Sequence, residues 1–331
     1  MLMKQLVAYV VLRSRARKPL DYSRVERRQP SDKSPHVNDS FYFGGRDAHG
    51  TSAVFRLGFR PGLPTERWCD LVLPGRGHLA GYGPAEPDAA AIRCGGLELD
   101  CLEPARSWAV RWSGPMRCGG RTHDVRADLR FTADAAVVDF ARDGDSRGLA
   151  GYLARERWSG EWLRKLRDLR QVHYEQGGTL EGRVSVDGAD RGVRLAAVRD
   201  HSFGSRNWSA MRRHAWLMAL LDDGSHVNLS LVSYDFLPYM HSGYRVARDR
   251  VSPVTRAPRF EDIPSEISRG TSFTASFGAG DPENLRLECS VDEVLEYSMD
   301  GRYRFFEGLA AFRLGGRSGV GICEFGRVER P

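Results

Sequence analysis

The sequence predicts an all-β, mainly antiparallel protein whose two β-rich halves are joined by one helix. Short runs of β-branched and aromatic residues recur between Gly, Pro and Asp turns along most of the chain, a pattern typical of β-sandwiches and barrels. The chain has 331 residues, which exceeds the usual size of one domain. We therefore predict an N-terminal arm over residues 1–38, a first β domain over 39–175 that includes a linking helix over 158–174, and a second β domain over 176–331.

The first half opens with a predicted hairpin. Residues 40–45 and 53–59 are aromatic and β-branched runs on either side of a turn that contains Gly and Asp. Similar runs, separated by Gly, Pro and Asp, predict the other strands of this half. They cover residues 68–73, 97–102, 108–112, 124–131 and 137–140.

The linking helix is predicted from a change of period. Trp158, Trp162 and Leu166 follow one another at four-residue steps among charged residues, which gives a helix one apolar face. Beyond it the chain returns to strands joined by Asp-Gly turns, a strong hairpin pattern. The predicted strands of the second half cover residues 179–186, 193–198, 215–221, 226–234, 272–277, 285–294, 303–314 and 320–328.

The charge pattern excludes one class of partner. The chain holds 49 Lys and Arg residues against 43 Asp and Glu, which gives a net charge of +6. Beyond a basic cluster near the N-terminus the arginines are spread singly or in pairs, whereas a nucleic-acid interface needs clustered cations. We therefore expect no nucleic-acid partner.

Cysteine usage and the N-terminus indicate the compartment. The six cysteines include no Cys-x-x-Cys, which predicts free core thiols, with one or two disulfides as the alternative for an exported chain. The apolar run over 6–12 is shorter than a spanning helix and lacks a cleavage site. We expect a cytoplasmic protein and leave its oligomeric state open. A weak contact of the N-terminus with a membrane surface also stays open, because cations follow the apolar run.

The densest group of polar and aromatic residues lies over 199–216. Asp200, His201 and His214 are candidate catalytic residues, since a carboxylate and imidazoles can perform acid–base chemistry. The alternative is a structural role in tying the barrel together. Asp200 and His201 are adjacent, so on a strand they point to opposite faces and cooperate only if the chain turns there. The candidate substrate-binding residues of this segment are Arg206, Trp208 and Trp216, whose indoles could stabilise positive charge on a substrate.

A second segment, residues 234–244, mixes aromatic side chains with polar tips. Tyr234, Asp235 and Tyr239 are candidate substrate-binding residues at the mouth of a pocket. The alternative is an ordinary loop that contains Pro238. Two isolated carboxylates, Glu175 and Glu324, are expected to be exposed or ion-paired.

The motifs resemble one known family. Arg-Asp-His-Ser-Phe-Gly-Ser-Arg-Asn-Trp over 199–208 and His-Ala-Trp over 214–216 are similar to the central motif of the lipocalin-like hydroxyneurosporene synthase (carotenoid hydratase) superfamily. Its relatives include Diels-Alderase-type cyclases and a domain found alone or with phosphoenolpyruvate-synthase-like proteins. Segments 39–43, 173–178 and 319–325 support the resemblance.

The resemblance implies two tandem lipocalin-like β-barrel or half-barrel domains, with a hydrophobic pocket near their interface. It matches His214 and Trp216 to a His-x-Trp pair of carotenoid hydratases. It also matches Tyr234 and Asp235 to a Tyr and an Asp that are implicated in carotenoid hydratases. These two residues are adjacent here, which departs from the spacing in the family.

These observations predict an enzyme that cyclises, isomerises or hydrates a hydrophobic polyene or terpenoid-like molecule. P-loop, zinc-protease and serine-hydrolase motifs are absent from the sequence. The nine histidines lack metal-ligand spacing, so we expect no metal and no cofactor. Two alternatives remain, a module that binds a lipophilic ligand without changing it and a purely structural interaction domain.

Overall fold

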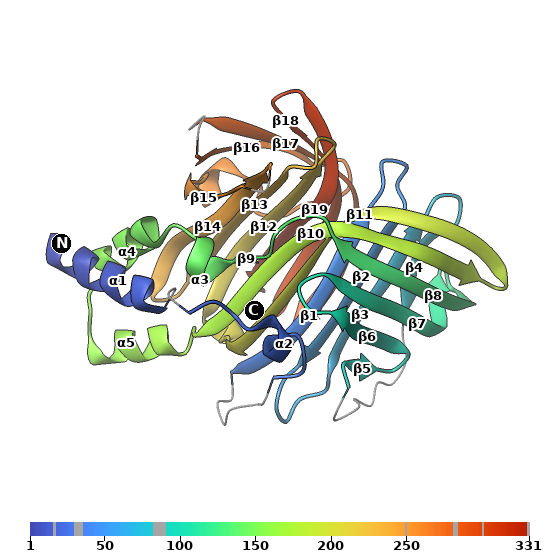
Figure 1. Cartoon of the computed structure of the whole chain (residues 1–331), viewed down its shortest axis with the longest axis horizontal. Coiled ribbons are helices and arrows are strands. Elements are labelled where there is room, and N and C mark those ends of the chain that lie inside the picture. The colour runs from blue at the N-terminus through green and yellow to red at the C-terminus, as the bar shows by residue number, and fades with distance from the viewer. Residues whose placement is uncertain are drawn as a thin grey trace. The chain divides into compact units, whose positions relative to one another are not determined.

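The computed structural model describes residues 1–15, 18–29, 36–81, 91–248, 250–280, 284–299 and 301–329. It divides into two compact units, which are described separately. Unit 1 contains Met1–Pro19, Val138–Val172 and Ser205–Pro331, and unit 2 contains Leu20–Val137 and His173–Gly204. Nearly all strand pairs in Figure 1 are antiparallel neighbours in one of two sheets, which confirms the predicted fold class.

The sheet of unit 2 forms a ring of strands. They follow one another in the order β4-β3-β2-β1-β11-β10-β8-β7, and pairing of β4 with β7 closes the ring. The ring strands are β1 Val37–Arg46, β2 Ser52–Phe59, β3 Glu66–Leu73, β4 Gly77–Gly81, β7 Ser107–Cys118, β8 Arg121–Ala133, β10 Gln171–Val186 and β11 Ala189–Ser205, and β6 Leu97–Glu103 with β5 Arg93–Cys94 extends it beyond β7.

Two-residue alternation explains why this ring encloses a core. Along β8, Val125, Ala127, Leu129 and Phe131 are buried, and the residues between them are exposed. These four side chains belong to one apolar cluster. Because successive side chains of a strand point to opposite faces, one face of the ring is apolar and the other is more polar.

Unit 1 contains a closed barrel of eight strands, β12 to β19, in which β19 pairs with β12. Ala215, Leu217, Ala219 and Leu221 of β12 lie in its apolar core. The bounds are β12 Met211–Leu221, β13 His226–Tyr234, β14 Leu237–Ala247, β15 Arg250–Arg256, β16 Ser272–Ala279, β17 Leu285–Met299, β18 Tyr303–Leu314 and β19 Arg317–Val328.

The linking helix is shorter than predicted, which corrects its bounds. Helix α5 covers Gly160–Arg167, the Ser159 side chain accepts a hydrogen bond from the Trp162 amide at its start, and the chain enters β10 at Gln171. The predicted last turn, including Val172 and Tyr174, therefore belongs to a strand. Aromatic and β-branched residues favour strands, and the sheet supplies partners that the sequence alone does not show.

The described part of the chain contains more helices than the one predicted. The arm expected over 1–38 includes α1 and α2, and its residues 16–17 and 30–35 lie outside the described residues. The further elements are α1 Leu2–Arg15, α2 Tyr22–Val25, α3 Phe140–Asp143, α4 Ser146–Arg155, two short 3-10 turns, η1 Trp208–Ala210 and η2 Phe260–Asp262, and the two-residue strand β9 Val138–Asp139. Among the described residues, no helix combines the length and the apolar character needed to cross a bilayer. All six cysteines are free thiols, as expected.

Candidate active site

Strand geometry separates the three consecutive polar residues of β11. Arg199 and His201 are buried, at 2% and 1% exposure, and contact other core-side groups of unit 2. Asp200 points to the opposite face, where it meets His173. The two candidate catalytic residues Asp200 and His201 are therefore not brought together.

His201 is held in a buried chain of hydrogen bonds. Its Nε2 lies 2.8 Å from Asp39 Oδ1, and its Nδ1 lies 2.9 Å from the Tyr174 hydroxyl. Phe41 stacks on the imidazole with ring centroids 3.9 Å apart. Nε2 thus faces a carboxylate, which accepts, and Nδ1 faces a hydroxyl, which can donate to it. Burial, with the nearby Glu26 carboxylate, raises the pKa of Tyr174. These contacts suit a fixed structural group.

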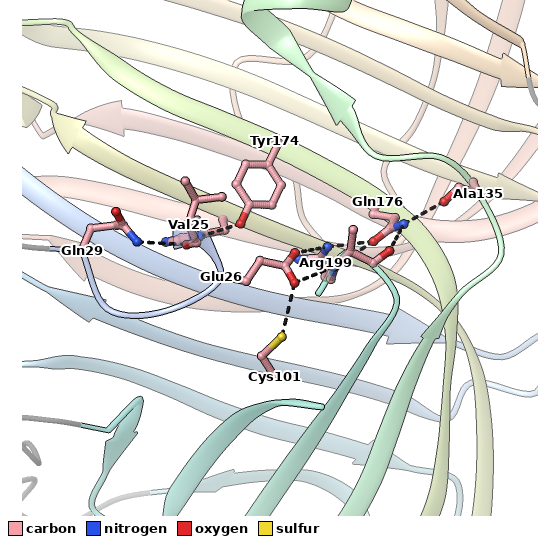
Figure 2. Close-up of polar contacts among 10 residues, drawn as sticks. Val25, Glu26, Gln29, Cys101, Ala135, Tyr174, Gln176 and Arg199 are labelled. Atoms are coloured by element: carbon pink, nitrogen blue, oxygen red, sulfur yellow. Dashed lines mark hydrogen bonds and ion pairs between the residues drawn. The ribbon is translucent and has the colours of Figure 1, made fainter. Parts of the chain in front are cut away.

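Arg199 is the centre of a second buried network, which Figure 2 shows. Its guanidinium contacts Glu26 and donates to Gln176 Oε1 at 2.8 Å. The Glu26 carboxylate also accepts from the Ala105 amide at 2.7 Å and from Cys101 Sγ at 3.4 Å. Glu26 directly follows α2, so this network ties the N-terminal arm to β10 and β11 of unit 2.

The opposite face of β10 and β11 carries His173, Glu175 and Asp200. The ligand-type atoms of these three residues lie within 4.8 Å of one another, and His173 Nε2 is 3.4 Å from Glu175 Oε1. Burial opposes protonation of His173, but the Asp200 and Glu175 carboxylates outweigh it and raise its pKa to about 9. At neutral pH a proton on His173 therefore links the carboxylates. The same three ligand atoms also lie close enough together to hold a metal ion, a grouping that the spacing of the histidines in the sequence does not predict.

Unit 1 contains another polar group, centred on His214. Its Nε2 lies 2.6 Å from Glu324 Oε1 of β19, and its Nδ1 lies 2.7 Å from the Tyr303 hydroxyl of β18. The side chains of His214 and Glu324 are 10% and 14% exposed. Burial, followed by the Glu324 charge, raises the pKa of Tyr303. A carboxylate, an imidazole and a phenol thus form one chain of hydrogen bonds that solvent still reaches.

A missing side chain makes room for this arrangement. In the barrel register Gly326 is the partner of His214. A Cβ on Gly326 would lie 2.2 Å from His214 Cε1 and 2.6 Å from Tyr303 Cε1. The imidazole and phenol can therefore stack, with centroids 5.7 Å apart and 10° between their planes.

Aromatic side chains lie beside the His214 chain. Phe305 is 5.4 Å from the His214 ring and 5.3 Å from Trp208, and Trp208 is 5.6 Å from Tyr303. The Arg206 guanidinium lies 4.9 Å from the Trp208 ring. Trp208 is positioned by η1, where the Asn207 side chain accepts from the Ala210 amide.

Trp216, Tyr234 and Asp235 of the predicted site lie in different places. Trp216 is two residues from His214 along β12, so it shares that face, and its register partner is Glu324. Burial of Tyr234 raises the pKa of its hydroxyl, and the Arg206 charge opposes this rise. Asp235 is half-exposed and pairs with Arg212 at 2.5 Å.

Tyr239 belongs to a different group of unit 1. Its hydroxyl donates to the Pro258 carbonyl at 2.8 Å, and its ring contacts Tyr152 and His241. The Tyr152 hydroxyl lies 2.7 Å from His241 Nδ1. Tyr239 is thus not among the residues that contact His214.

Sequence reasoning missed Tyr303, Phe305 and Gly326. Glu324 lay in a segment that supported the family resemblance but was expected only to be exposed or ion-paired. The Glu324 side chain is 14% exposed and is hydrogen-bonded to His214. These residues are about 90 to 110 positions from His214, and only the register of β12, β18 and β19 brings them together.

Comparisons with known proteins identify the family and the fold. A family model described as a domain of unknown function (DUF7064) matches residues 23–329. No curated protein matches the sequence at a significant level. The fold is similar to that of a Nitrosomonas europaea protein provisionally named AttH, with 14% identity, a TM-score of 0.59, and coverage of 93% of this chain and 97% of that chain. The predicted resemblance to the hydroxyneurosporene synthase-like fold is thereby confirmed.

Two further solved structures are similar to this chain. Kievitone hydratase from Nectria haematococca matches with 9% identity and a TM-score of 0.49 over 88% of each chain. CghA matches with 10% identity and a TM-score of 0.49 over 89% of each chain. At these values the matches concern the course of the backbone, so a function has to be argued from the residues of this chain.

Proposed function

This chain belongs to the family described as a domain of unknown function (DUF7064), and we propose that it is an enzyme that transfers a proton to or from an unsaturated hydrophobic small molecule without a cofactor. His214 is the acid–base group of this proposal. The observation that carries it is the chain of hydrogen bonds from Glu324 through His214 to Tyr303, bordered by Trp208 and Phe305.

The hydrogen bonds of His214 support both of its protonation states. The neutral ring donates from Nε2 to the Glu324 carboxylate and accepts the Tyr303 hydroxyl proton at Nδ1. The protonated ring donates to both oxygens. When the protonated ring donates from Nδ1 to the Tyr303 oxygen, the Tyr303 hydroxyl is free to donate its own proton to the substrate, so the chain supplies the proton by relay.

The neighbouring side chains favour a hydrophobic, electron-rich substrate. Protonation of an alkene or a carbonyl can start a cationic cyclisation, an isomerisation or a hydration. The Trp208 face would stabilise the positive charge that this step creates. Arg206, which lies over the same indole, would donate hydrogen bonds to an oxygen of the substrate. We assign substrate contacts to Trp216, which shares the face of β12 that carries His214, and to Tyr234, whose register partner is Met211 at the start of that strand.

The predicted catalytic residues Asp200 and His201 receive structural roles in this proposal. His201 is 1% exposed, and both of its ring nitrogens have partners. Asp200 is paired with His173. Asp235, which is half-exposed in its pair with Arg212, and Tyr239, which contacts a different group, receive no catalytic part.

The first experiment identifies the substrate and measures turnover. Mass spectrometry of small molecules retained by the purified protein supplies candidate ligands. With such a substrate, we expect His214→Gln to lower turnover about 10²- to 10⁴-fold. Tyr303→Phe should lower it to a similar extent, because the phenol passes the proton on, whereas Glu324→Gln should lower it less, because Glu324 acts through the ring. His123→Gln, at a histidine of unit 2 outside the site, is the control. Full turnover by His214→Gln would overturn the proposal.

Gly326→Ala tests the positioning of His214 separately. The added methyl group would occupy the place of the imidazole, so kcat should fall while the fold remains. Gly224→Ala, in a turn with no neighbouring atom within 4 Å, should keep the wild-type kcat.

A second function remains open because both nitrogens of His214 already have partners. The same site would then bind a lipophilic ligand without changing it. In that case the retained molecule leaves the protein chemically unaltered after long incubation. His214→Gln would weaken its binding, and no product would form.

A further inference from the structure

Helix α1 presents an apolar stripe to solvent. Leu2, Leu6 and Val10 follow one another at four-residue steps and therefore share one face of the helix. Leu6 is 62% exposed and Val10 57% exposed. Met3, Val7 and Val11 form the adjacent row and are also exposed. Most of the large exposed apolar side chains in the described part of the chain belong to this helix.

The amphipathic pattern of α1 is inverted relative to that of an ordinary surface helix. Figure 1 shows α1 beside α4, within unit 1. The side that contacts this part of the unit carries Lys4, whose Nζ donates to the Glu156 carbonyl at 3.0 Å. It also carries the buried Ala8, and Tyr9 under the Arg147 guanidinium. A helix stabilised only by packing on its own domain would bury its apolar face. The exposed stripe therefore points to a partner outside the chain.

The charges near the stripe favour an anionic partner. The first 20 residues contain five cations, Lys4, Arg13, Arg15, Arg17 and Lys18, and no Asp or Glu. Two copies of the stripe facing each other would bring these like charges together, whereas anionic lipid would neutralise them. At 14 residues the helix is too short to span a bilayer but long enough to lie along its surface.

We propose that α1 is a membrane-surface anchor whose stripe of Leu2, Met3, Leu6, Val7, Val10 and Val11 inserts among the acyl chains of an anionic bilayer, with Arg13 and Lys18 at the headgroups. The anchor is independent of the chemistry proposed at His214. It requires no change in the contacts between α1 and α4, because the anchoring side chains already point away from them.

Vesicle flotation of the full chain tests the anchor. Vesicles of phosphatidylcholine with roughly one third phosphatidylglycerol should carry the wild-type protein, and phosphatidylcholine alone should carry much less. Binding should fall when salt is raised from about 50 mM to about 500 mM. Leu6→Glu/Val10→Glu should weaken binding at least about tenfold. Leu163→Glu is the matched control, because Leu163 is an exposed leucine of α5, and it should bind like the wild type.

Circular dichroism checks that the double variant is folded, and light scattering measures the oligomeric state of both proteins. Both replaced side chains are exposed, so the double variant should keep the wild-type melting temperature. Equal binding of the wild type and the folded double variant to anionic vesicles would overturn the proposal. A second result would also overturn it: the wild type is a dimer that does not bind vesicles, and the double variant is a monomer. The stripe would then be covered by a second copy of the chain.

Discussion

Single residues of β11 acquire different roles because a strand alternates its faces. Arg199 and His201 join buried networks on the core side, and Asp200 between them joins His173 on the other side. A cluster that is dense in sequence is therefore divided in space. Stability measurements can distinguish these structural roles from catalytic ones.

The buried ion pair between Glu26 and Arg199 should be strongly coupled. Both side chains are almost fully buried, so removing one charge leaves the other unpaired in the core. We expect Glu26→Gln or Arg199→Met to lower the free energy of unfolding by about 3–5 kcal/mol. The double variant should lose less than the sum of the two. Urea unfolding of the four proteins measures this coupling.

An exposed pair provides the comparison. Arg183 and Asp190 lie 3.3 Å apart with most of their surface in solvent, so Asp190→Asn should cost less than about 1 kcal/mol. Additive effects of Glu26→Gln and Arg199→Met would show that the buried pair is not coupled.

His173 should make stability depend on alkaline pH. Its pKa in the folded protein is about 9, above the value of roughly 6.5 in an unfolded chain. The folded state therefore holds a proton that the unfolded state releases between these values. The stabilisation is complete below about pH 6.5 and is lost as the pH rises through about 9, with a size on the order of 3 kcal/mol.

The measurement is the free energy of unfolding from about pH 6 to about pH 10. The wild type should lose stability over this range more steeply than His173→Gln, which lacks the titrating group. Parallel curves for the two proteins would mean that the carboxylates do not hold the proton on His173.

At the scale of elements, a glycine determines how closely β13 and β14 approach. Gly243 of β14 has a φ of 138°, and a Cβ there would lie 2.3 Å from the Asn228 carbonyl oxygen. The backbone conformation and the clash both oppose a side chain. We expect Gly243→Ala to lower the free energy of unfolding by about 2–4 kcal/mol.

Gly224→Ala separates the two causes. Gly224 also has a positive φ, 77°, but nothing lies within 4 Å of an added Cβ. Its replacement should cost only the backbone term, about 1–2 kcal/mol. Equal losses for the two variants in thermal or urea unfolding would show that the close approach at Asn228 does not matter.

Strands were easier to predict than helices in this chain. Runs such as 226–234 and 303–314 match β13 and β18 closely, because alternation and Asp-Gly or Gly-Gly turns are local patterns. The helix predicted over 158–174 ends at Arg167, because the residues from Gln171 onward form β10 and pair with neighbouring strands. Helix α1 lies within the predicted N-terminal arm, and its exposed apolar face does not follow the pattern of a helix packed on its own core.

The candidate site depends on contacts between strands that are far apart in the sequence. His214, Trp208 and Arg206 are close in sequence and were predicted together. Their partners Tyr303 and Glu324 come from the far end of the barrel, where β18 and β19 close against β12. The register of a closing strand depends on the packing of the entire barrel, so a single sequence gives no local pattern for it.

The two units have separate apolar cores, which predicts that local damage remains within one unit. Gly243→Ala weakens the barrel of unit 1, so hydrogen–deuterium exchange should accelerate in peptides from β12 to β19 and stay near wild type in β1 to β3. Arg199→Met should produce the reverse pattern. Cooperative opening within a core is the physical reason, because amides exchange when their own contact network unfolds. If either variant accelerates exchange equally in both sets of peptides, the chain unfolds as one cooperative structure despite its two cores.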